Sequence, residues 1–155
     1  MGIEKDIQQT CFRNEFQKLG INIIYTANWL NEKIAHVLTN EEITQQQYNI
    51  LRILRGSECP LSTLKIRERM LDKMSDTSRI VDRLITMGLV EKNDCLKYKR
   101  LVDITLSNKG IALVEKLDHY NDQIDAILKG VTEKDAQLMN QILDKIRASA
   151  AEQQK

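Results

Sequence analysis

The sequence predicts a mainly α-helical protein that carries one small β-hairpin. Apolar residues recur at three- and four-residue steps over most of the 155 residues, as they do on the buried face of a helix. Alternating branched residues appear only in Leu89–Val90 and again from Leu101 to Leu106, with a polar stretch between them. Hydrophobic residues make up 42% of the chain and charged residues 29%, which suits a soluble domain with a modest core. We therefore expect residues 1–155 to form a single domain.

Several classes of protein are not expected from the composition. No apolar run approaches the roughly 18 residues of a membrane span. The first ten residues lack the order of a signal peptide, so we expect a cytoplasmic protein without a membrane partner. The three cysteines, Cys11, Cys59 and Cys95, and the two histidines, His36 and His119, show no metal-ligand spacing and no nucleophile–base spacing. We therefore expect no metal, no cofactor and no enzymatic activity.

A long amphipathic helix is predicted near the amino terminus. Its apolar positions follow helical spacing and share one face: Phe12, Phe16, Leu19, Ile23, Ala27, Leu30, Ile34 and Val37. Gly20 is expected to weaken or kink this helix. So long an amphipathic helix in so small a chain needs a partner, which is either its own carboxyl-terminal segment or a second subunit.

Three shorter helices are predicted to follow. Thr44 and Gln47 have the spacing of a capping box at the start of the first, and Gly56 is a plausible end for it. After Pro60, Ser62 or Thr63 is placed to cap a second helix that reaches Leu71. A tight connection then leads to a third helix from about Ser75 to Met87.

The remaining elements are a hairpin and two helices. Gly88 is suited to end the third helix, and the hairpin follows it. Ser107 is predicted to begin a helix that continues to Leu128 and is ended by Gly130. Thr132 is predicted to begin the last helix. Two helices joined by a tight turn and followed by a two-stranded ribbon form a winged helix-turn-helix. We expect this lobe at about 44–107, with dimerisation helices at about 1–38 and 110–155.

The second helix of the motif shows two faces. Its apolar face contains Thr77, Ile80, Val81, Leu84 and Met87. Its polar face contains Ser75, Asp76, Ser78, Arg79, Asp82 and Arg83, gathered towards the amino-terminal half. That half is where a recognition helix meets base edges, and serine, threonine and arginine suit such hydrogen bonds. The basic stretch KYKR (Lys97 to Arg100) lies in the expected hairpin, so the pattern predicts contact with double-stranded DNA.

These stretches resemble the multiple-antibiotic-resistance regulator (MarR) family. ITQQQYNILRIL, SDTSRIVDRLITMGLVEK and KYKRLVDITLSNKG match family blocks in order and spacing between Ile43 and Gly110. With the flanking helices, the resemblance covers nearly the whole chain. It implies a homodimer that acts as a ligand-responsive repressor on a palindromic operator.

The resemblance also implies roles for individual residues. Ser75, Thr77, Ser78, Arg79 and Arg83 would lie on the groove-facing helix, and Arg100 would enter a minor groove from the wing, beside Lys97, Tyr98 and Lys99. Two positions depart from the family pattern. Tyr98 stands where the family usually has an aspartate, and Arg67 stands where a small residue usually packs.

A site for a small-molecule effector is expected on the first helix. Tyr25, Trp29 and His36 belong to a polar and aromatic stripe beside its apolar face, and such side chains can line a pocket. Packing of the same stripe against a neighbouring helix is the alternative, and the residue pattern favours it.

Two alternative functions remain open at this point. The net charge of only +1 and Tyr98 are consistent with a winged-helix module that binds proteins and not DNA. A thiol-based redox regulator is the other alternative, with Cys11 as its candidate thiol, and only Arg13 and Lys18 lie near it in sequence as cations.

Overall fold

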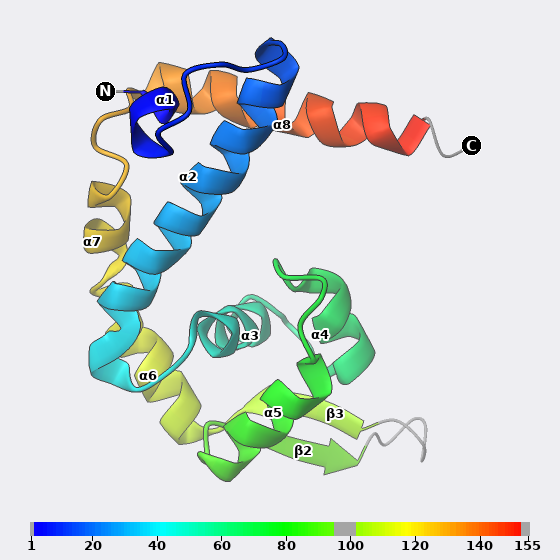
Figure 1. Cartoon of the computed structure of the whole chain (residues 1–155). Helices are drawn as coiled ribbons and strands as arrows, with labels where there is room; N and C mark the ends of the chain where they lie inside the picture. Colours follow the sequence, from blue (N-terminus) through cyan, green and yellow to red (C-terminus); the bar gives the residue numbers. More distant parts are fainter. Residues whose placement is uncertain (1, 95–101, 153–155) are drawn as a thin grey trace. The chain divides into compact units, whose positions relative to one another are not determined.

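The computed structural model describes residues 2–94 and 102–152. By its internal contacts the chain divides into two compact units, Met1–Asn121 and Asp122–Lys155. The elements follow one another as α1 (Ile3–Asp6), α2 (Glu15–Leu38), the 3-10 turn η1 (Thr39–Glu41), α3 (Gln45–Arg55), β1 (Leu61–Ser62), α4 (Thr63–Arg69), α5 (Thr77–Thr86), β2 (Val90–Asp94), β3 (Val102–Leu106), α6 (Asn108–Asp118), α7 (Asn121–Ala126) and α8 (Glu133–Glu152) (Figure 1). A mainly helical chain with one small hairpin is confirmed.

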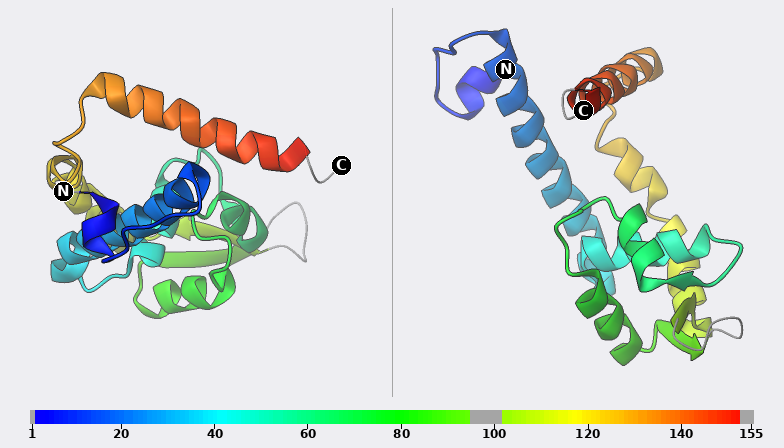
Figure 2. Two further views of the ribbon diagram at one scale, coloured as in Figure 1. Left: turned by 45° about the horizontal axis from the view of Figure 1, so that its top comes forward. Right: turned by 90° about the vertical axis from the view of Figure 1, so that its right-hand side faces the viewer.

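Helix α2 is a single uninterrupted helix of 24 residues (Figures 1 and 2). The Asn14 side chain caps it by accepting a hydrogen bond from the Gln17 backbone at 2.9 Å. Gly20 does not break it, and a methyl group at this position would meet no atom within 4 Å. None of the residues of the predicted apolar face is fully buried, and Phe16 is 84% exposed. Helix α2 therefore has a large apolar face without a partner inside its own unit.

The predicted helix boundaries in the middle of the chain are set by side-chain caps. Thr44 and Gln47 form the expected reciprocal capping box of α3, and Gly56 is its C-cap. Ser62 caps α4 and Ser107 caps α6. These predictions are confirmed because each depends only on residues within one helical turn.

The β-hairpin pairs β2 with β3 in antiparallel register, from Val90 opposite Leu106 to Asp94 opposite Val102. The sheet also has a third strand that the sequence did not predict. Leu61 of β1 lies opposite Ile104 of β3, which gives the strand order β1-β3-β2. Strand β1 has only two residues, too few for a period-two pattern to be visible.

The core of the first unit lies between helices α3 to α6 and the sheet. Its largest fully buried side chains are Leu38, Ile50, Leu51, Ile66, Met70, Val81, Leu84, Val90, Ile104, Val114 and Leu117. Helix α5 packs against α3, α4 and β2, so its orientation is fixed by three neighbours. This packing buries the face of α5 that carries Val81 and Leu84.

A close backbone contact joins the base of the hairpin to α6. Gly88 adopts a φ of 73°, the left-handed conformation expected at the end of α5. The Ser107 hydroxyl donates to the Gly88 carbonyl at 2.6 Å and accepts from the Gly110 backbone at 3.0 Å. A Cβ atom at Gly110 would lie 2.0 Å from the carbonyl oxygen of Leu89, so only glycine fits here.

The prediction of one continuous helix from Ser107 to Leu128 is wrong, because α6 ends at Asp118 and a separate helix, α7, begins at Asn121. At this break the Tyr120 hydroxyl donates to the Glu41 carboxylate at 2.8 Å. That long-range contact fixes Tyr120 outside a regular helix, and apolar spacing cannot reveal it.

Helix α8 of the second unit starts as predicted. The Thr132 hydroxyl accepts a hydrogen bond from the Asp135 backbone at 3.2 Å, which caps the helix. Its larger apolar side chains are exposed: Leu138, Met139, Ile142 and Ile146. Within residues 2–94 and 102–152, none of the helices combines the length and the apolar character needed to cross a bilayer.

Candidate nucleic-acid interface

Helix α5 presents one apolar and one polar face, as predicted. Val81 and Leu84 are buried against the lobe. On the opposite side Ser78, Arg79 and Arg83 are exposed. Neither arginine forms an ion pair with any residue that the structure describes. Two guanidinium groups are thus free to bind a ligand outside the chain.

Two other residues that were predicted to contact DNA do not lie on the exposed face of α5. Thr77 is only 3% exposed, and its hydroxyl oxygen has no hydrogen-bond partner among the described residues. Ser75 is half-buried, and its hydroxyl donates to the Asp72 carbonyl at 2.8 Å. Thr77 therefore belongs to the core side of α5, and Ser75 belongs to the turn that precedes it.

Asp76 has a structural role that the sequence analysis missed. Its carboxylate accepts a hydrogen bond from the Arg79 backbone at 3.1 Å and so caps α5. Aspartate is among the preferred N-cap residues, and its position directly before the helix was the available signal. This cap fixes the amino-terminal turn from which Ser78 and Arg79 project.

An ion pair links the hairpin to α5. The Lys92 ammonium of β2 lies 2.9 Å from the Asp82 carboxylate of α5. Both side chains are about half exposed, so the pair is worth little in stability. It places the cation of Lys92 beside the exposed face of α5. The sequence pattern did not single out Lys92.

The end of the hairpin lies outside the described residues. Cys95, Lys97, Tyr98, Lys99 and Arg100 belong to this stretch, so their expected roles stay predictions. The strands that lead to it are in place, since β2 ends at Asp94 and β3 begins at Val102.

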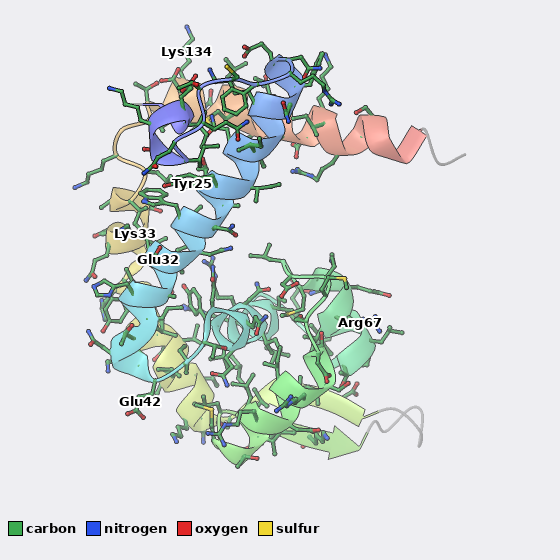
Figure 3. The ribbon with its side chains drawn as sticks, in the orientation of Figure 1. Tyr25, Glu32, Lys33, Glu42, Arg67 and Lys134 are labelled. Carbon is green, nitrogen blue, oxygen red and sulfur yellow. The ribbon has the colours of Figure 1, made fainter. Side chains whose placement is uncertain are left out.

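Positive charge is concentrated in the lobe that carries α5. Residues 44–107 contain twelve lysines and arginines against eight aspartates and glutamates, a net charge of +4 within a chain whose total is +1. The rest of the chain is therefore at −3. Arg67 adds to the cationic surface, because it is exposed on α4 and extends away from the lobe (Figure 3).

The residues expected to hold an effector lie along α2. Tyr25 is 40% exposed and Trp29 is 38% exposed, and His36 is also exposed. Tyr25 projects from the middle of the helix (Figure 3). None of the three lines the cavity at Asp72 or the cavity at Arg55, and an effector site at these residues stays a prediction.

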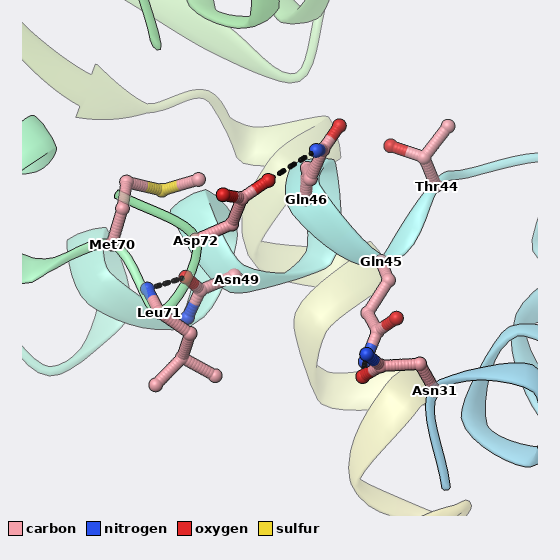
Figure 4. Close-up of a pocket in the computed structure, with 8 residues that line it drawn as sticks. All are labelled: Asn31, Thr44, Gln45, Gln46, Asn49, Met70, Leu71 and Asp72. Atoms are coloured by element: carbon pink, nitrogen blue, oxygen red, sulfur yellow. Dashed lines mark hydrogen bonds between the residues drawn. The ribbon is translucent and has the colours of Figure 1, made fainter. Parts of the chain in front are cut away.

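The larger cavity has a volume of about 540 Å³ and lies between α2, the start of α3 and the turn before α5 (Figure 4). Its lining residues are Asn31, Thr44, Gln45, Gln46, Asn49, Met70, Leu71 and Asp72. Hydrogen bonds join these walls: Gln45 donates to Asn31 at 2.9 Å, and Gln46 donates to Asp72 at 2.9 Å. The Leu71 backbone donates to the Asn49 side chain at 3.0 Å. The cavity thus adjoins the segment that leads into α5.

A smaller cavity of about 280 Å³ lies between α3 and α6. Arg55 lines it and pairs with Asp118, a second lining residue, at 2.5 Å. The Arg52 guanidinium lies 5.8 Å from the centre of the Tyr48 ring, within the range of a cation–π contact. Arg55 thus links α3 to α6, whereas the contact of Arg52 stays within α3.

The arrangement of these elements recurs in solved structures. A mutant MarR from E. coli complexed with operator DNA superposes with a TM-score of 0.79 and 22% identity, over 88% of this chain and 99% of that chain. The chain has the MarR fold. A putative MarR-like transcription regulator from Bacillus cereus superposes with a TM-score of 0.77 and 18% identity, over 87% of this chain and 97% of that chain.

The MarR fold is also that of MepR from S. aureus in a DNA complex. Its TM-score is 0.75 at 20% identity, over 84% of this chain and 96% of that chain. No protein-family model matches the sequence, and neither does any curated protein. The fold that the resemblance implied is therefore confirmed by structure, at identities that are low throughout.

Proposed function

We propose that this protein is a transcription regulator of the MarR family that binds duplex DNA through α5 and the hairpin. The observation that carries the proposal is the exposed face of α5, where Arg79 and Arg83 are unpaired within the described chain. This face belongs to a lobe of net charge +4. Two proteins with the same fold, MarR and MepR, were solved with DNA. Free guanidinium groups on a supported helix suit hydrogen bonding to guanine in a major groove.

The contacts divide into three kinds by their position. Arg79 projects from the capped first turn of α5 and would bond a base edge, which specifies sequence. Lys92 lies beside α5 and would neutralise phosphate. Arg100, with Lys97, Tyr98 and Lys99, would enter the adjacent minor groove from the hairpin, where preference follows groove width.

The protein would act as a homodimer. The exposed apolar face of α2, with Phe16, Leu19 and Ile24, and the exposed apolar residues of α8 are larger than a soluble monomer usually shows. Burial of these faces against a second copy would remove them from water. A two-fold dimer presents two α5 helices, so the operator would be a near-palindrome with half-sites about 10 base pairs apart.

Control by a small molecule would complete this function. The same fold occurs in RdhR, solved in its 2,4-dichlorophenol bound form, and in BpsR, whose DNA binding is regulated by 6-hydroxynicotinic acid. In this chain the 540 Å³ cavity beside α5 has a volume typical of ligand sites. We accordingly propose a cytoplasmic, ligand-responsive repressor.

Selection of duplexes from a random pool by the purified protein tests the proposal. We expect a near-palindromic sequence, bound in a gel-shift assay with an affinity that falls as salt rises. Arg79→Ala should lose the preference at one operator position, whereas Arg52→Ala, an exposed arginine of α3, should bind as wild type does. If no sequence is enriched and random duplex is not bound, the alternative of a protein-interaction module is supported instead.

A further inference from the structure

The larger cavity of the first unit has an unusual chemical lining. Its polar side chains are one hydroxyl, four amides and the carboxylate of Asp72 (Figure 4). No lysine, arginine or histidine is among its lining residues. The fixed charge of the wall is therefore negative, and an anion would enter without a counter-charge.

The Asp72 carboxylate faces this cavity without a cation. One of its oxygens accepts from the Gln46 amide at 2.9 Å, and the other accepts from the Met74 backbone at 3.0 Å. The nearest lysine in sequence, Lys73, donates instead to the Glu68 carbonyl. Within residues 2–94 and 102–152, Asp72 has no ion-pair partner. Each oxygen keeps a free lone pair, so the carboxylate can accept two further hydrogen bonds.

An apolar surface adjoins this carboxylate. Leu71 is 83% exposed although it lines the cavity, and Met70 beside it is buried. A ligand body that covered Leu71 would remove an exposed leucine from water, which is favourable in proportion to the apolar area covered. The cavity thus offers one anionic and one apolar contact next to each other.

We propose that this cavity binds a small organic cation that has N–H donors at one end and an apolar body at the other. An amidinium or a primary ammonium group would donate to Asp72, and the body would lie on Leu71. The amides of Gln45, Gln46 and Asn49 can turn to present either oxygen or nitrogen, so they adapt to the ligand, whereas the carboxylate cannot.

Binding at this site would change the affinity for DNA, a part of the inference that rests on the proposed function. The Asp72 carbonyl accepts from the Ser75 hydroxyl at 2.8 Å, and Asp76 caps α5 directly after it. A ligand that bonds the Asp72 carboxylate would pull on this turn, which Gln46 and Asn49 tie to α3. The first turn of α5, which carries Ser78 and Arg79, would then shift.

Calorimetry without DNA tests the ligand class, with three probes of one shape: benzamidinium, benzamide and benzoate. We expect saturable binding of benzamidinium, at least about tenfold tighter than that of benzamide, because its hydrogen bonds to Asp72 are charge-assisted. Benzoate should not bind. Asp72→Asn keeps an oxygen that can accept from the Met74 backbone, and it should weaken the binding of benzamidinium by about tenfold. Glu68→Gln, which removes an equal charge outside the cavity, should leave it unchanged.

Binding of benzoate as tight as that of benzamidinium would overturn the proposal, and so would unchanged benzamidinium binding by Asp72→Asn. The probe comparison on the wild-type protein decides the matter even if the variant does not fold. Gel shifts with and without benzamidinium test the regulatory part, which is wrong if bound ligand leaves DNA affinity unchanged. DNA binding measured without any probe tests the proposed function separately.

Discussion

Replacement of Gly110 by alanine tests how the hairpin is attached to α6. The new Cβ atom would lie 2.0 Å from the Leu89 carbonyl oxygen, whereas separations below 3.0 Å are essentially never seen. Leu89 must therefore move by about 1 Å. Its backbone cannot move alone, because its N–H donates to the Leu84 carbonyl at 2.9 Å and its own carbonyl accepts from Ser107 at 3.1 Å.

The magnitude follows from these contacts. Overpacking of a close contact costs about 1–3 kcal/mol, and a buried backbone group that loses its partner costs about 1–3 kcal/mol more. The helix propensity of alanine returns at most about 1 kcal/mol. We expect Gly110→Ala to lower the free energy of unfolding by about 3 kcal/mol, which for a chain of this length lowers Tm by roughly 10 °C.

Urea unfolding followed by circular dichroism, at one protein concentration, measures the effect. Gly20→Ala is the matched control, because its Cβ atom meets nothing within 4 Å in α2, and it should be neutral or stabilise by up to about 1 kcal/mol. If Gly110→Ala were as stable as wild type with the same unfolding slope, the close approach of α6 to Leu89 would be refuted.

Three further predictions concern single residues. Lys116 and Tyr120 bond the Glu41 carboxylate and lower its pKa below the usual 4.5, so this contribution to stability is complete above that pH and is lost as pH falls through the lowered pKa. In acid, the free energy of unfolding of Glu41→Gln should accordingly fall less with decreasing pH than that of wild type. Thr77→Val removes a buried hydroxyl without a described partner and should raise the free energy of unfolding, measured with urea, by about 1 kcal/mol. A lower free energy of unfolding would indicate that the hydroxyl makes a hydrogen bond. Phe16→Asp should weaken dimerisation by at least about tenfold in analytical ultracentrifugation, and an unchanged dimer would place the interface elsewhere.

Local features of this fold could be predicted from the sequence. The caps at Thr44, Ser62 and Ser107 and the two faces of α5 depend on residues within a turn or two, and all were confirmed. The break after Asp118 could not be predicted, because it accompanies a contact between Tyr120 and Glu41, 79 positions apart.

The candidate site could also be predicted only where it depends on residues close together in the sequence. Helical spacing found Ser78, Arg79 and Arg83, whose exposure depends only on which face of α5 is apolar. It could not show that Lys92 pairs with Asp82, since that pair requires the register of the hairpin. Nor could it find the cavity at Asp72, whose walls come from three separate parts of the chain.

A salt titration of DNA binding tests whether the exposed face of α5 reads DNA. Fluorescence anisotropy would compare wild type, Arg79→Ala and Arg100→Ala on the selected operator and on random duplex. We predict that Arg79→Ala loses about 1–3 kcal/mol of operator preference and keeps its affinity for random duplex. Arg100→Ala should weaken binding to both and reduce the salt slope by about one. Operator preference that is unchanged in Arg79→Ala would show that Arg79 does not read a base.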